Sequence, residues 1–268
     1  KEPYKENEVK AILHPLVSKW FFSRFKEFSL PQLYGVMEIH LGRNILVSAP
    51  TGATKTLTAF LSILNELVGL AKMQELEDRV YCVYVSPLKA LSYDIEINLN
   101  NPLDEMNKLN GKDLGIRVGV RTGDTSQTER SKMLRKSPHI LITTPESLAI
   151  MINAVKFRDH LRDVKWMIID EIHALAENKR GVHLNLSVER LKMISASFSR
   201  IGLSATISPL EEIAKYLVGD KGDCMIADVQ FIKQMDLKVI SPVPDMINVK
   251  HEVMLTELYE LIDNLIQE

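Results

Sequence analysis

The stretch Ser48-Ala49-Pro50-Thr51-Gly52-Ala53-Thr54-Lys55-Thr56 lies between an apolar run, Ile45-Leu46-Val47, and a helical pattern from Leu57 to Leu70. A strand, a tight loop ending in Lys-Thr and a helix form a phosphate-binding loop, because backbone N–H groups there point at phosphate oxygens. In such a loop Lys55 reaches the β- and γ-phosphates of a nucleotide, and the Thr56 hydroxyl binds Mg²⁺. The sequence therefore predicts a nucleotide and Mg²⁺ as cofactors, with the nucleotide held by Thr51, Gly52, Ala53, Thr54, Lys55 and Thr56.

Thr54 occupies the position where this loop usually has Gly. Gly allows the backbone to approach a phosphate closely and to adopt conformations that disfavour a Cβ atom. If the position needs φ > 0, a β-branched Thr costs about 1–3 kcal/mol, or about ten- to a hundredfold in nucleotide affinity. If the backbone is helical there, Thr only crowds the phosphates. The sequence leaves both alternatives open.

The composition limits the class of protein. The chain has 268 residues, of which 46% are hydrophobic, enough for one large α/β domain and the start of another. No apolar run has the length of a membrane span, and the charged segment from Lys1 to Lys10 lacks the apolar core of a signal peptide. The two cysteines, Cys82 and Cys224, are predicted to be buried thiols rather than a disulfide. We therefore expect a cytoplasmic protein that does not bind a membrane.

The net charge of −2 excludes a wholly basic nucleic-acid binder but allows a local basic groove.

Apolar runs and helical patterns alternate between Asn44 and about Ala227. The runs are predicted strands: Ile45–Ser48, Val80–Ser86, Gly115–Val120, His139–Thr143, Val164–Asp170, Arg200–Ser204 and Cys224–Ala227. Helices are predicted between them, among them Thr56–Met73 and Leu184–Ser197. This alternation predicts an α/β fold with a doubly wound parallel sheet flanked by helices. Such sheets bind ligands at the carboxyl ends of their strands.

Three segments are predicted along the chain. Residues 1–43 form helices against the sheet domain, and residues 44–228 form the nucleotide-binding domain. Residues 229–268 contain a predicted strand, Met235–Ile240, then two prolines and a helical pattern, Leu255–Gln267. We expect this last segment to be a linker and the beginning of a second, truncated domain.

A second motif, Trp166-Met167-Ile168-Ile169-Asp170-Glu171-Ile172-His173, ends an apolar strand with two acids. Such acids are costly there unless a cation uses them. In an enzyme with a phosphate-binding loop the first acid, Asp170, holds Mg²⁺ and the second, Glu171, polarises the attacking water. The alternative is an acidic helix N-cap, which is the better interpretation for an isolated Asp-Glu pair.

Ser204-Ala205-Thr206 follows another apolar strand and precedes a helix-start signal, Ser208-Pro209. Hydroxyl groups there can hydrogen-bond the acids and respond to loss of the γ-phosphate. His173 is expected to couple the acids to Thr206 or to a partner domain. No Cys/His cluster has the spacing of a zinc site, so zinc is not expected.

Further motifs occur in a fixed order, and this order resembles that of the superfamily-two helicases. They are Gln32, Ala49–Thr56, Ser86-Pro87-Leu88-Lys89-Ala90-Leu91, Thr122-Gly123-Asp124, Thr143-Thr144-Pro145-Glu146-Ser147-Leu148, Asp170–His173 and Ser204–Thr206. The chain is similar to the first RecA-like domain of such a helicase over about residues 14–250. Asp-Glu-Ile-His, Thr-Pro-Glu-Ser-Leu and the segment Lys179-Arg180-Gly181-Val182-His183-Leu184 together resemble the Lhr, or large helicase-related, group.

The resemblance implies roles for these residues. Gln32 would read the adenine of ATP, and the catalytic residues would be Lys55, Asp170 and Glu171. A single strand, or partly duplex DNA or RNA, would be held by Pro87, Lys89, Arg121, Thr122, Gly123, Thr144, Pro145, Glu146 and Ser147. Arg130, Lys132 and Arg135 either line the same track or form a solvated basic helix face. His173, Ser204 and Thr206 would couple the two sites, and a second RecA-like domain would complete the nucleotide cleft.

Three hypotheses about function follow. The first is an ATP-dependent 3′-to-5′ helicase motor domain that is nearly inactive without its partner domain. The second is a nucleic-acid-binding or scaffold module in which Thr54 has disabled hydrolysis. The third is an ATPase unrelated to nucleic acid, which Thr-Pro-Glu-Ser-Leu and Pro-Leu-Lys-Ala-Leu disfavour. Contacts to a strand backbone carry little base information, so DNA and RNA both stay possible.

Overall fold

The fold is described from a computed structural model of the chain, which covers residues 2–50, 54–195, 197–229, 240–245 and 247–267, without the side chains of residues 89–93 and 267. The chain divides into two compact units, Lys1–Phe231 and Ile232–Glu268. Each unit is described by itself.

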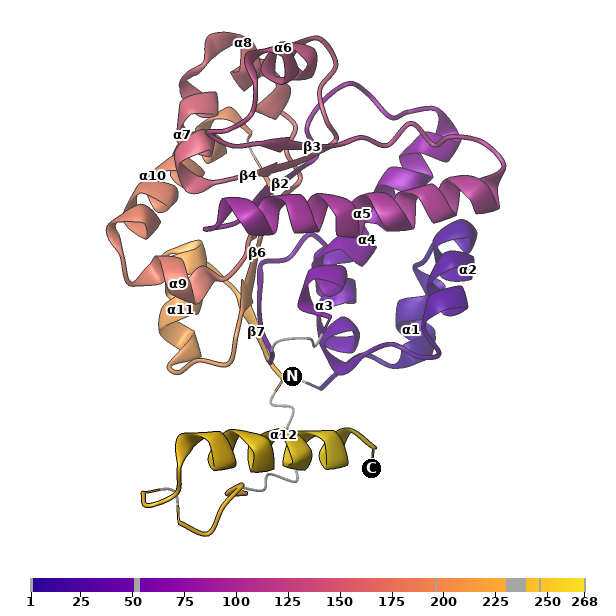
Figure 1. The fold of residues 1–268 in the computed structure, drawn as a ribbon. Coiled ribbons are helices and arrows are strands. Elements are labelled where there is room, and N and C mark those ends of the chain that lie inside the picture. The colour runs from indigo at the N-terminus through magenta and orange to yellow at the C-terminus, as the bar shows by residue number, and fades with distance from the viewer. Residues whose placement is uncertain (1, 51–53, 196, 230–239, 246, 268) are drawn as a thin grey trace. The chain divides into compact units, whose positions relative to one another are not determined.

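A seven-stranded sheet forms the centre of the first unit (Figure 1). Its strands in chain order are β1 (Ile45–Ser48), β2 (Cys82–Val85), β3 (Val118–Arg121), β4 (Ile140–Thr143), β5 (Trp166–Ile169), β6 (Ser199–Ser204) and β7 (Met225–Asp228). Their spatial order is β3-β4-β2-β5-β6-β1-β7, and every neighbouring pair is parallel. The predicted doubly wound parallel sheet is confirmed, and each predicted apolar run overlaps one of these strands. Strands β3 and β7 end one residue later than predicted, and β6 starts one residue earlier.

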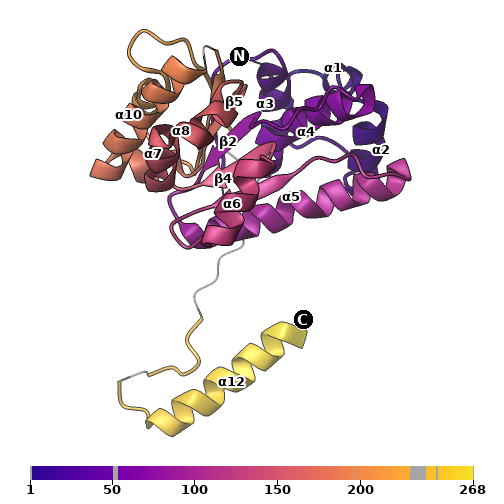
Figure 2. The ribbon, with the colours of Figure 1, turned by 90° about the horizontal axis from the view of Figure 1, so that it is seen from above.

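Helices cover both faces of the sheet. One core cluster joins one face of the strands to α1 (Glu6–Ala11), α2 (Pro15–Arg24), α3 (Leu30–His40), α4 (Lys55–Met73) and α5 (Lys89–Asn110). The other joins the opposite face to α6 (Gln127–Arg135), α7 (Pro145–Asn153), α8 (Val155–Arg158), the 3₁₀ turn η1 (Asp159–Leu161), α9 (Ile172–Ala176), α10 (Lys179–Ile194) and α11 (Leu210–Val218). Figure 2 shows α7, α8 and α10 on one side of the sheet and α1 to α4 on the other.

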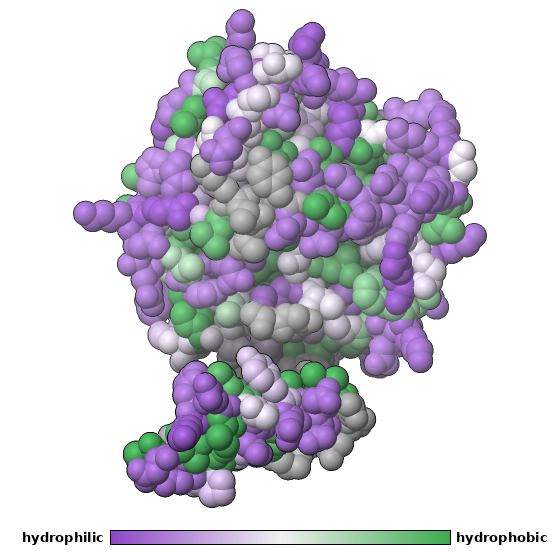
Figure 3. All heavy atoms as spheres, viewed as in Figure 1, coloured by the Kyte–Doolittle hydropathy of each residue, from purple (hydrophilic) through white to green (hydrophobic). Residues whose placement is uncertain are grey.

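Strand β2 shows why its sequence is apolar without alternation. Cys82 and Tyr84 belong to the first core cluster, whereas Val83 and Val85 belong to the second. Successive side chains of a strand point to opposite faces, and both faces of this sheet are covered by helices. The surface of the first unit that is seen in Figure 3 is mostly hydrophilic, with scattered hydrophobic side chains.

Helix α4 is the one described helix that is long and apolar enough to cross a membrane. No such run was predicted from the sequence. Of its most apolar window, 56% is buried inside the protein, and residues such as Phe60, Leu64 and Leu67 are in the first core cluster. Its apolar composition is therefore explained by its central position in the fold.

Helix α10 differs from the prediction at its start. It begins at Lys179, five residues before the predicted Leu184. The side chain of Asn178 caps it by accepting a hydrogen bond from the backbone N–H of Gly181 at 3.1 Å. An Asn at the N-cap is a strong helix-start signal, and it was missed because the apolar pattern begins only one turn later.

The two cysteines are free thiols, as predicted. Cys82 is fully buried on β2, and Cys224 is half-buried just before β7. Burial raises the pKa of the Cys224 thiol to about 11.

The second unit contains the helix α12 (His251–Gln267). Before this helix, Asp245 Oδ1 accepts hydrogen bonds from the backbone N–H groups of Ile247 and Asn248. Residues 235–239 of the predicted strand Met235–Ile240 lie outside the described part of the chain. The predicted domain boundaries stay predictions.

Candidate nucleotide and nucleic-acid sites

The carboxyl ends of all seven strands lie at one edge of the sheet, because every neighbouring pair is parallel. The predicted nucleotide-binding segments follow β1, β5 and β6, which are adjacent in the sheet. The predicted strand-binding segments follow β2, β3 and β4, which are also adjacent. The fold therefore separates the candidate residues into a nucleotide half and a strand half that meet between β2 and β5.

The phosphate-binding loop leads into α4, which begins at Lys55. Thr51, Gly52 and Ala53 lie outside the described residues. Thr54 is the N-cap of α4 and has φ 58° and ψ 22°, in the left-handed region that disfavours a β-branched residue. Two alternatives were left open for Thr54: a strained backbone with φ > 0, or a helical backbone. The structure has φ > 0.

A hydrogen bond holds the Thr54 side chain. Its Oγ1 lies 2.6 Å from Oγ of Ser29, the N-cap of α3. Helices α3 and α4 approach closely at Gly35, where an added Cβ would lie 2.6 Å from Thr58 Cγ2. This close approach lets Ser29 reach Thr54 from a segment 25 residues earlier in the chain.

Gln32 is in the first turn of α3 and is almost completely buried. Its side-chain Oε1 accepts a hydrogen bond from the backbone N–H of Ser29 at 2.9 Å. Gln32 is not among the residues that line the cavity described below. The structure thus connects Gln32 to the phosphate-binding loop through Ser29.

Lys55 is buried, with 8% of its surface exposed. Its Nζ donates hydrogen bonds to the carbonyl oxygens of Ala49 at 2.6 Å and Pro50 at 3.1 Å. Burial lowers the pKa of the Lys55 ammonium, and the nearby carboxylates of Glu171 and Asp170 partly oppose this by favouring the charged form.

Asp170 follows β5 directly and is 8% exposed. Oδ1 accepts a hydrogen bond from the backbone N–H of Glu171 at 2.9 Å, and Oδ2 accepts one from the hydroxyl of Tyr84. Tyr84 is on the neighbouring strand β2, is fully buried and stacks on Phe60 with ring centroids 5.4 Å apart. Burial raises the pKa of the Asp170 carboxyl, and the hydrogen bond from Tyr84 opposes that rise. Tyr84 was not predicted as a site residue, because a Tyr within an apolar strand is ordinary.

Glu171 is the N-cap of α9 and has φ 46° and ψ 42°, also in the left-handed region. Its Oε2 lies 3.4 Å from Nε2 of His173, and Nδ1 of His173 lies 3.1 Å from Oγ of Ser204. His173 thus connects the acid segment to the end of β6, through Ser204 rather than through the expected Thr206. Ser204 is buried at the end of the strand, whereas Thr206 is exposed beyond it.

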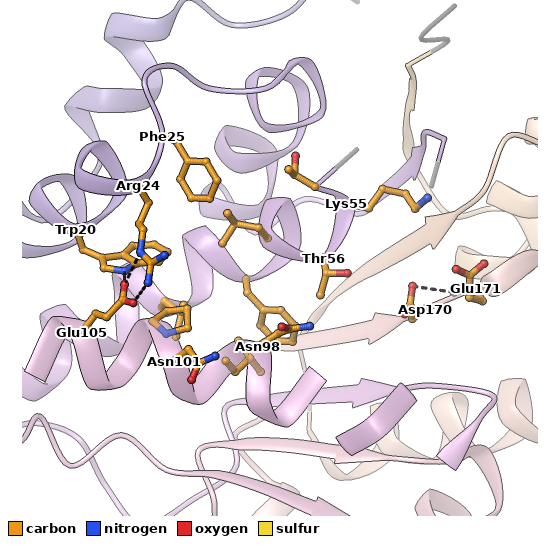
Figure 4. A pocket seen from close by; sticks show the side chains of 16 residues that line it. Trp20, Arg24, Phe25, Lys55, Thr56, Asn98, Asn101, Glu105, Asp170 and Glu171 are labelled. Carbon is orange, nitrogen blue, oxygen red and sulfur yellow. Dashed lines mark hydrogen bonds and ion pairs between the residues drawn. The ribbon is translucent and has the colours of Figure 1, made fainter. Parts of the chain in front are cut away.

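A cavity of about 560 Å³ extends from these residues (Figure 4). Lys55, Thr56 and the two acids lie at one end. At the other end Glu105 Oε2 accepts hydrogen bonds from Trp20 Nε1 at 2.8 Å and Arg24 Nε at 3.0 Å. Phe25, half-buried, lies between the two ends in Figure 4. None of these last four residues was predicted, although three of them come from one aromatic-rich segment shortly before Gln32.

In the strand half, two arginines lie close together. The Arg121 guanidinium at the end of β3 stacks over the Phe157 ring, 4.4 Å from its centroid. Arg130 Nη2 on α6 donates to the carbonyl oxygen of Gly123 at 3.0 Å, and more weakly to that of Thr122. Within the described part of the chain, Arg121 Nη1 and Arg130 Nε are buried without a hydrogen-bond partner. Burial and the charge of Arg130 lower the pKa of Arg121.

Helix α7 begins at Pro145, and Thr144 caps it by accepting a weak hydrogen bond from the backbone N–H of Ser147. Thr144 and Ser147 are buried, whereas Glu146 is exposed. Glu146 forms a bidentate ion pair with Arg180, at 2.6 Å to Nε and 3.2 Å to Nη2.

Arg180 Nη2 also donates to the carbonyl oxygen of Pro87 at 2.9 Å. Lys89 begins α5, but its side chain is outside the described part of the structure. Arg180 was not predicted to have a role of its own.

A parallel sheet with a Lys-Thr loop after β1 and paired acids after β5 defines a nucleotide-binding domain of the phosphate-loop class. Residues 30–216 match the DEAD/DEAH box helicase family, which is more than half of the chain. The chain belongs to this family.

The most informative relatives are Lhr proteins. The chain is 53% identical over 272 residues to the ATP-dependent helicase Lhr-Core of Methanothermobacter thermautotrophicus, and 52% identical over 273 residues to that of Methanocaldococcus jannaschii. These matches cover 99% and 100% of this chain but 32% of each relative, so the chain spans about a third of their length.

The solved structure of the Mycobacterium smegmatis helicase Lhr bound to ssDNA and AMP-PNP is also similar, with a TM-score of 0.80 and 39% identity. The match covers 97% of this chain and 33% of that one. The predicted RecA-like fold and the resemblance to Lhr helicases are confirmed.

Proposed function

We propose that this chain is the first RecA-like motor domain of an ATP-dependent Lhr-type helicase that moves 3′ to 5′ along a nucleic-acid strand. The observation that carries the proposal is the division of one sheet edge into a nucleotide half and an adjacent strand half. A motor needs the two ligands close enough for one to alter binding of the other. The Lhr structure with ssDNA and AMP-PNP supports the same pairing of ligands.

The residues of the nucleotide half fit ATP and Mg²⁺. A buried ammonium at Lys55 and a buried carboxylate at Asp170 are groups that a phosphate chain and its cation would pair with. Thr56 and Asp170 would hold Mg²⁺, which when bound supplies charge neutralisation at the phosphates.

Two other residues are proposed to contact the base of the nucleotide. Phe25 offers an aromatic ring for base stacking. Gln32 does not line the cavity, and by the resemblance alone it would read adenine; the group free to do so is its amide NH₂, since its Oε1 accepts from Ser29.

Glu171 is the proposed general base for hydrolysis. A carboxylate polarises water most effectively when it is held in position without being neutralised. His173 contacts both Glu171 and Ser204, so it can hold this carboxylate and transmit its position to β6. Asp170 stays fixed independently through Tyr84 and the Glu171 backbone N–H.

The strand half would bind phosphates. The buried N–H groups of Arg121 and Arg130 that have no partner in the described part of the chain are donors for an anion. The N-terminus of α7 and the segments around Pro87, Lys89, Thr122 and Gly123 would extend this track. Such contacts distinguish neither bases nor DNA from RNA, so single-stranded or partly duplex DNA and RNA are both proposed substrates.

The test is the ATPase rate of the protein that carries this chain at its natural length, with and without single-stranded DNA and RNA. Stimulation by either strand is expected, and a rate that no strand changes would refute the motor proposal. Residues 1–268 alone are expected to hydrolyse ATP negligibly, because the partner motor domain supplies arginines that stabilise the transferred phosphoryl group. Turnover within about tenfold of the longer protein would contradict this.

A second candidate is a nucleic-acid-binding module that does not hydrolyse ATP. The left-handed Thr54 favours it, because the loop departs from its usual sequence where the backbone demands Gly. Strand binding without strand-stimulated turnover in the longer protein would select this candidate.

A further inference from the structure

Arg180 makes three hydrogen bonds that join segments far apart in the sequence. Its guanidinium holds both carboxylate oxygens of Glu146, in the first turn of α7, and the carbonyl oxygen of Pro87, after β2. Both segments are in the proposed strand half, and neither is adjacent to α10 in sequence. A planar guanidinium with several fixed donors suits such a junction, whereas a lysine ammonium does not.

The pair with Glu146 has an electrostatic consequence for the strand half. Glu146 is an exposed acid in the first turn of α7, where the helix N-terminus otherwise favours a phosphate. The hydrogen bonds from the Arg180 guanidinium hold the pKa of the Glu146 carboxyl below its ordinary value, and the positive charge of Arg180 offsets that of the carboxylate. Without Arg180, a free carboxylate would face the phosphates of a bound strand.

Arg180 is also fixed to the acid segment of the nucleotide half. Helix α9 begins immediately after Glu171, and α10 begins at Lys179. At Gly181 an added Cβ would lie 1.9 Å from the carbonyl oxygen of Leu175, so the first turn of α10 packs directly on the end of α9. The carbonyl oxygen of Gly181 accepts a hydrogen bond from the Tyr216 hydroxyl at 2.8 Å. A displacement of α9 would therefore move Arg180.

We propose that Arg180 is a positioning residue that couples the nucleotide half to the strand half. It neutralises Glu146 and fixes the Pro87 segment, and it receives the position of Glu171 through α9 and Gly181. The inference rests on the proposed function, since it needs both ligands to bind. Coupling of this kind is a free energy shared by the two sites, so nucleotide must tighten strand binding by the same factor as strand tightens nucleotide binding.

The test is single-strand binding by the protein at its natural length, measured by fluorescence anisotropy over a salt series, with and without a non-hydrolysable ATP analogue. Arg180→Ala should weaken strand binding about five- to tenfold with the analogue present, because Glu146 then repels the strand. The factor by which the analogue tightens strand binding should fall towards one. Arg180→Ala with Glu146→Gln should recover most of the lost affinity but not the coupling.

The slope of log affinity against log salt separates positioning from direct phosphate contact. Arg180→Ala leaves the Glu146 carboxylate without its neutralising partner and so lowers the slope in either case. In the double variant with Glu146→Gln, positioning predicts the slope of the unaltered protein, whereas loss of a direct contact leaves it lower by about 0.7. Arg190→Ala is the matched control, because Arg190 also joins α10 to α7, through Asn153, but away from the strand segments. This variant should keep both affinity and coupling.

Four results would overturn the inference. They are an unchanged coupling factor in Arg180→Ala, a salt slope that stays lowered in the double variant, an equal effect of Arg190→Ala, or no rescue by Glu146→Gln. If the unaltered protein binds no strand at low salt, the proposed function fails and the inference fails with it. If it binds strands and Arg180→Ala behaves like the unaltered protein, only the inference fails.

Discussion

Replacing Thr54 by Gly tests whether the strain of the left-handed backbone lowers the free energy of unfolding or the nucleotide affinity. Protein contacts hold Thr54 at φ 58°: Ser29 Oγ lies 2.6 Å from its Oγ1, and its carbonyl oxygen accepts from Thr58 N at 2.9 Å and Thr58 Oγ1 at 3.1 Å. Because the fold itself maintains this conformation, the strain belongs to the free energy of unfolding. The sequence alone had suggested that it would reduce nucleotide affinity.

The stabilising and destabilising contributions of Thr54→Gly to the free energy of unfolding nearly cancel. Thr54→Gly relieves about 1–3 kcal/mol of backbone strain. It also removes the hydrogen bond to Ser29, worth about 0.5–1.5 kcal/mol, and adds about 0.5–1 kcal/mol of chain entropy to be lost on folding. We therefore expect the free energy of unfolding to change by no more than about 2 kcal/mol in either direction. Nucleotide affinity should rise less than the ten- to hundredfold estimated from strain alone.

The assay combines urea unfolding with calorimetric titration of a non-hydrolysable ATP analogue. Ser29→Ala should destabilise the unaltered chain by about 1 kcal/mol more than it destabilises the Thr54→Gly chain, because the hydrogen bond to Thr54 is already absent there, whereas the loss of the α3 N-cap is common to both backgrounds. Thr54→Ser, which keeps the hydroxyl and removes the β-branch, serves as the control. If Thr54→Gly binds the analogue about a hundredfold more tightly at unchanged stability, the strain is released on binding and this reasoning is wrong.

Three further predictions concern the proposed catalytic and strand residues. Tyr84→Phe should lower the free energy of unfolding by about 1.5–3 kcal/mol and weaken Mg²⁺-dependent binding of the ATP analogue, since Asp170 loses its buried donor. As a control, Tyr81→Phe removes a hydroxyl from the residue just before β2 and should leave the Mg²⁺ dependence unchanged. Glu171→Gln should abolish hydrolysis in the longer protein while analogue binding persists, and retained turnover would leave Glu171 only as the N-cap of α9. Arg121→Ala should lower the salt slope of strand binding by about 0.7, and an unchanged slope would exclude a direct phosphate contact.

The sheet could be predicted from the sequence because its strands are covered on both sides. Runs such as Ile45–Ser48 and Val80–Ser86 are apolar at consecutive positions, which only a strand buried on both faces requires at that length. The ends of the helices were predicted less accurately than the strands. The start of α10 is fixed by one side-chain hydrogen bond at Asn178, and an apolar pattern carries no information about that bond.

The contacts that organise the site could not be predicted, because they join residues that are remote in sequence and ordinary in type. Tyr84 looks like a β-strand residue until β5 places Asp170 beside it, and Ser29 looks like a helix cap until α4 places Thr54 within 2.6 Å. Arg180 looks like a surface cation until the strand order places Pro87 and Glu146 within its reach.

In each case the motif residue was identifiable from its neighbours along the chain, whereas the residue that holds it is identifiable only from its neighbours in space. Ser29 donates its backbone N–H to Gln32, and Tyr84 lies on the strand next to the one that Asp170 follows. Arg180 is in the first turn of α10, which packs on the end of α9. These holding residues adjoin the proposed ligand-binding groups and do not replace them. Ser29 and Tyr84 hold groups of the nucleotide half, so their substitution should change nucleotide binding, whereas Arg180 joins the two halves and its substitution should change the coupling factor between nucleotide and strand.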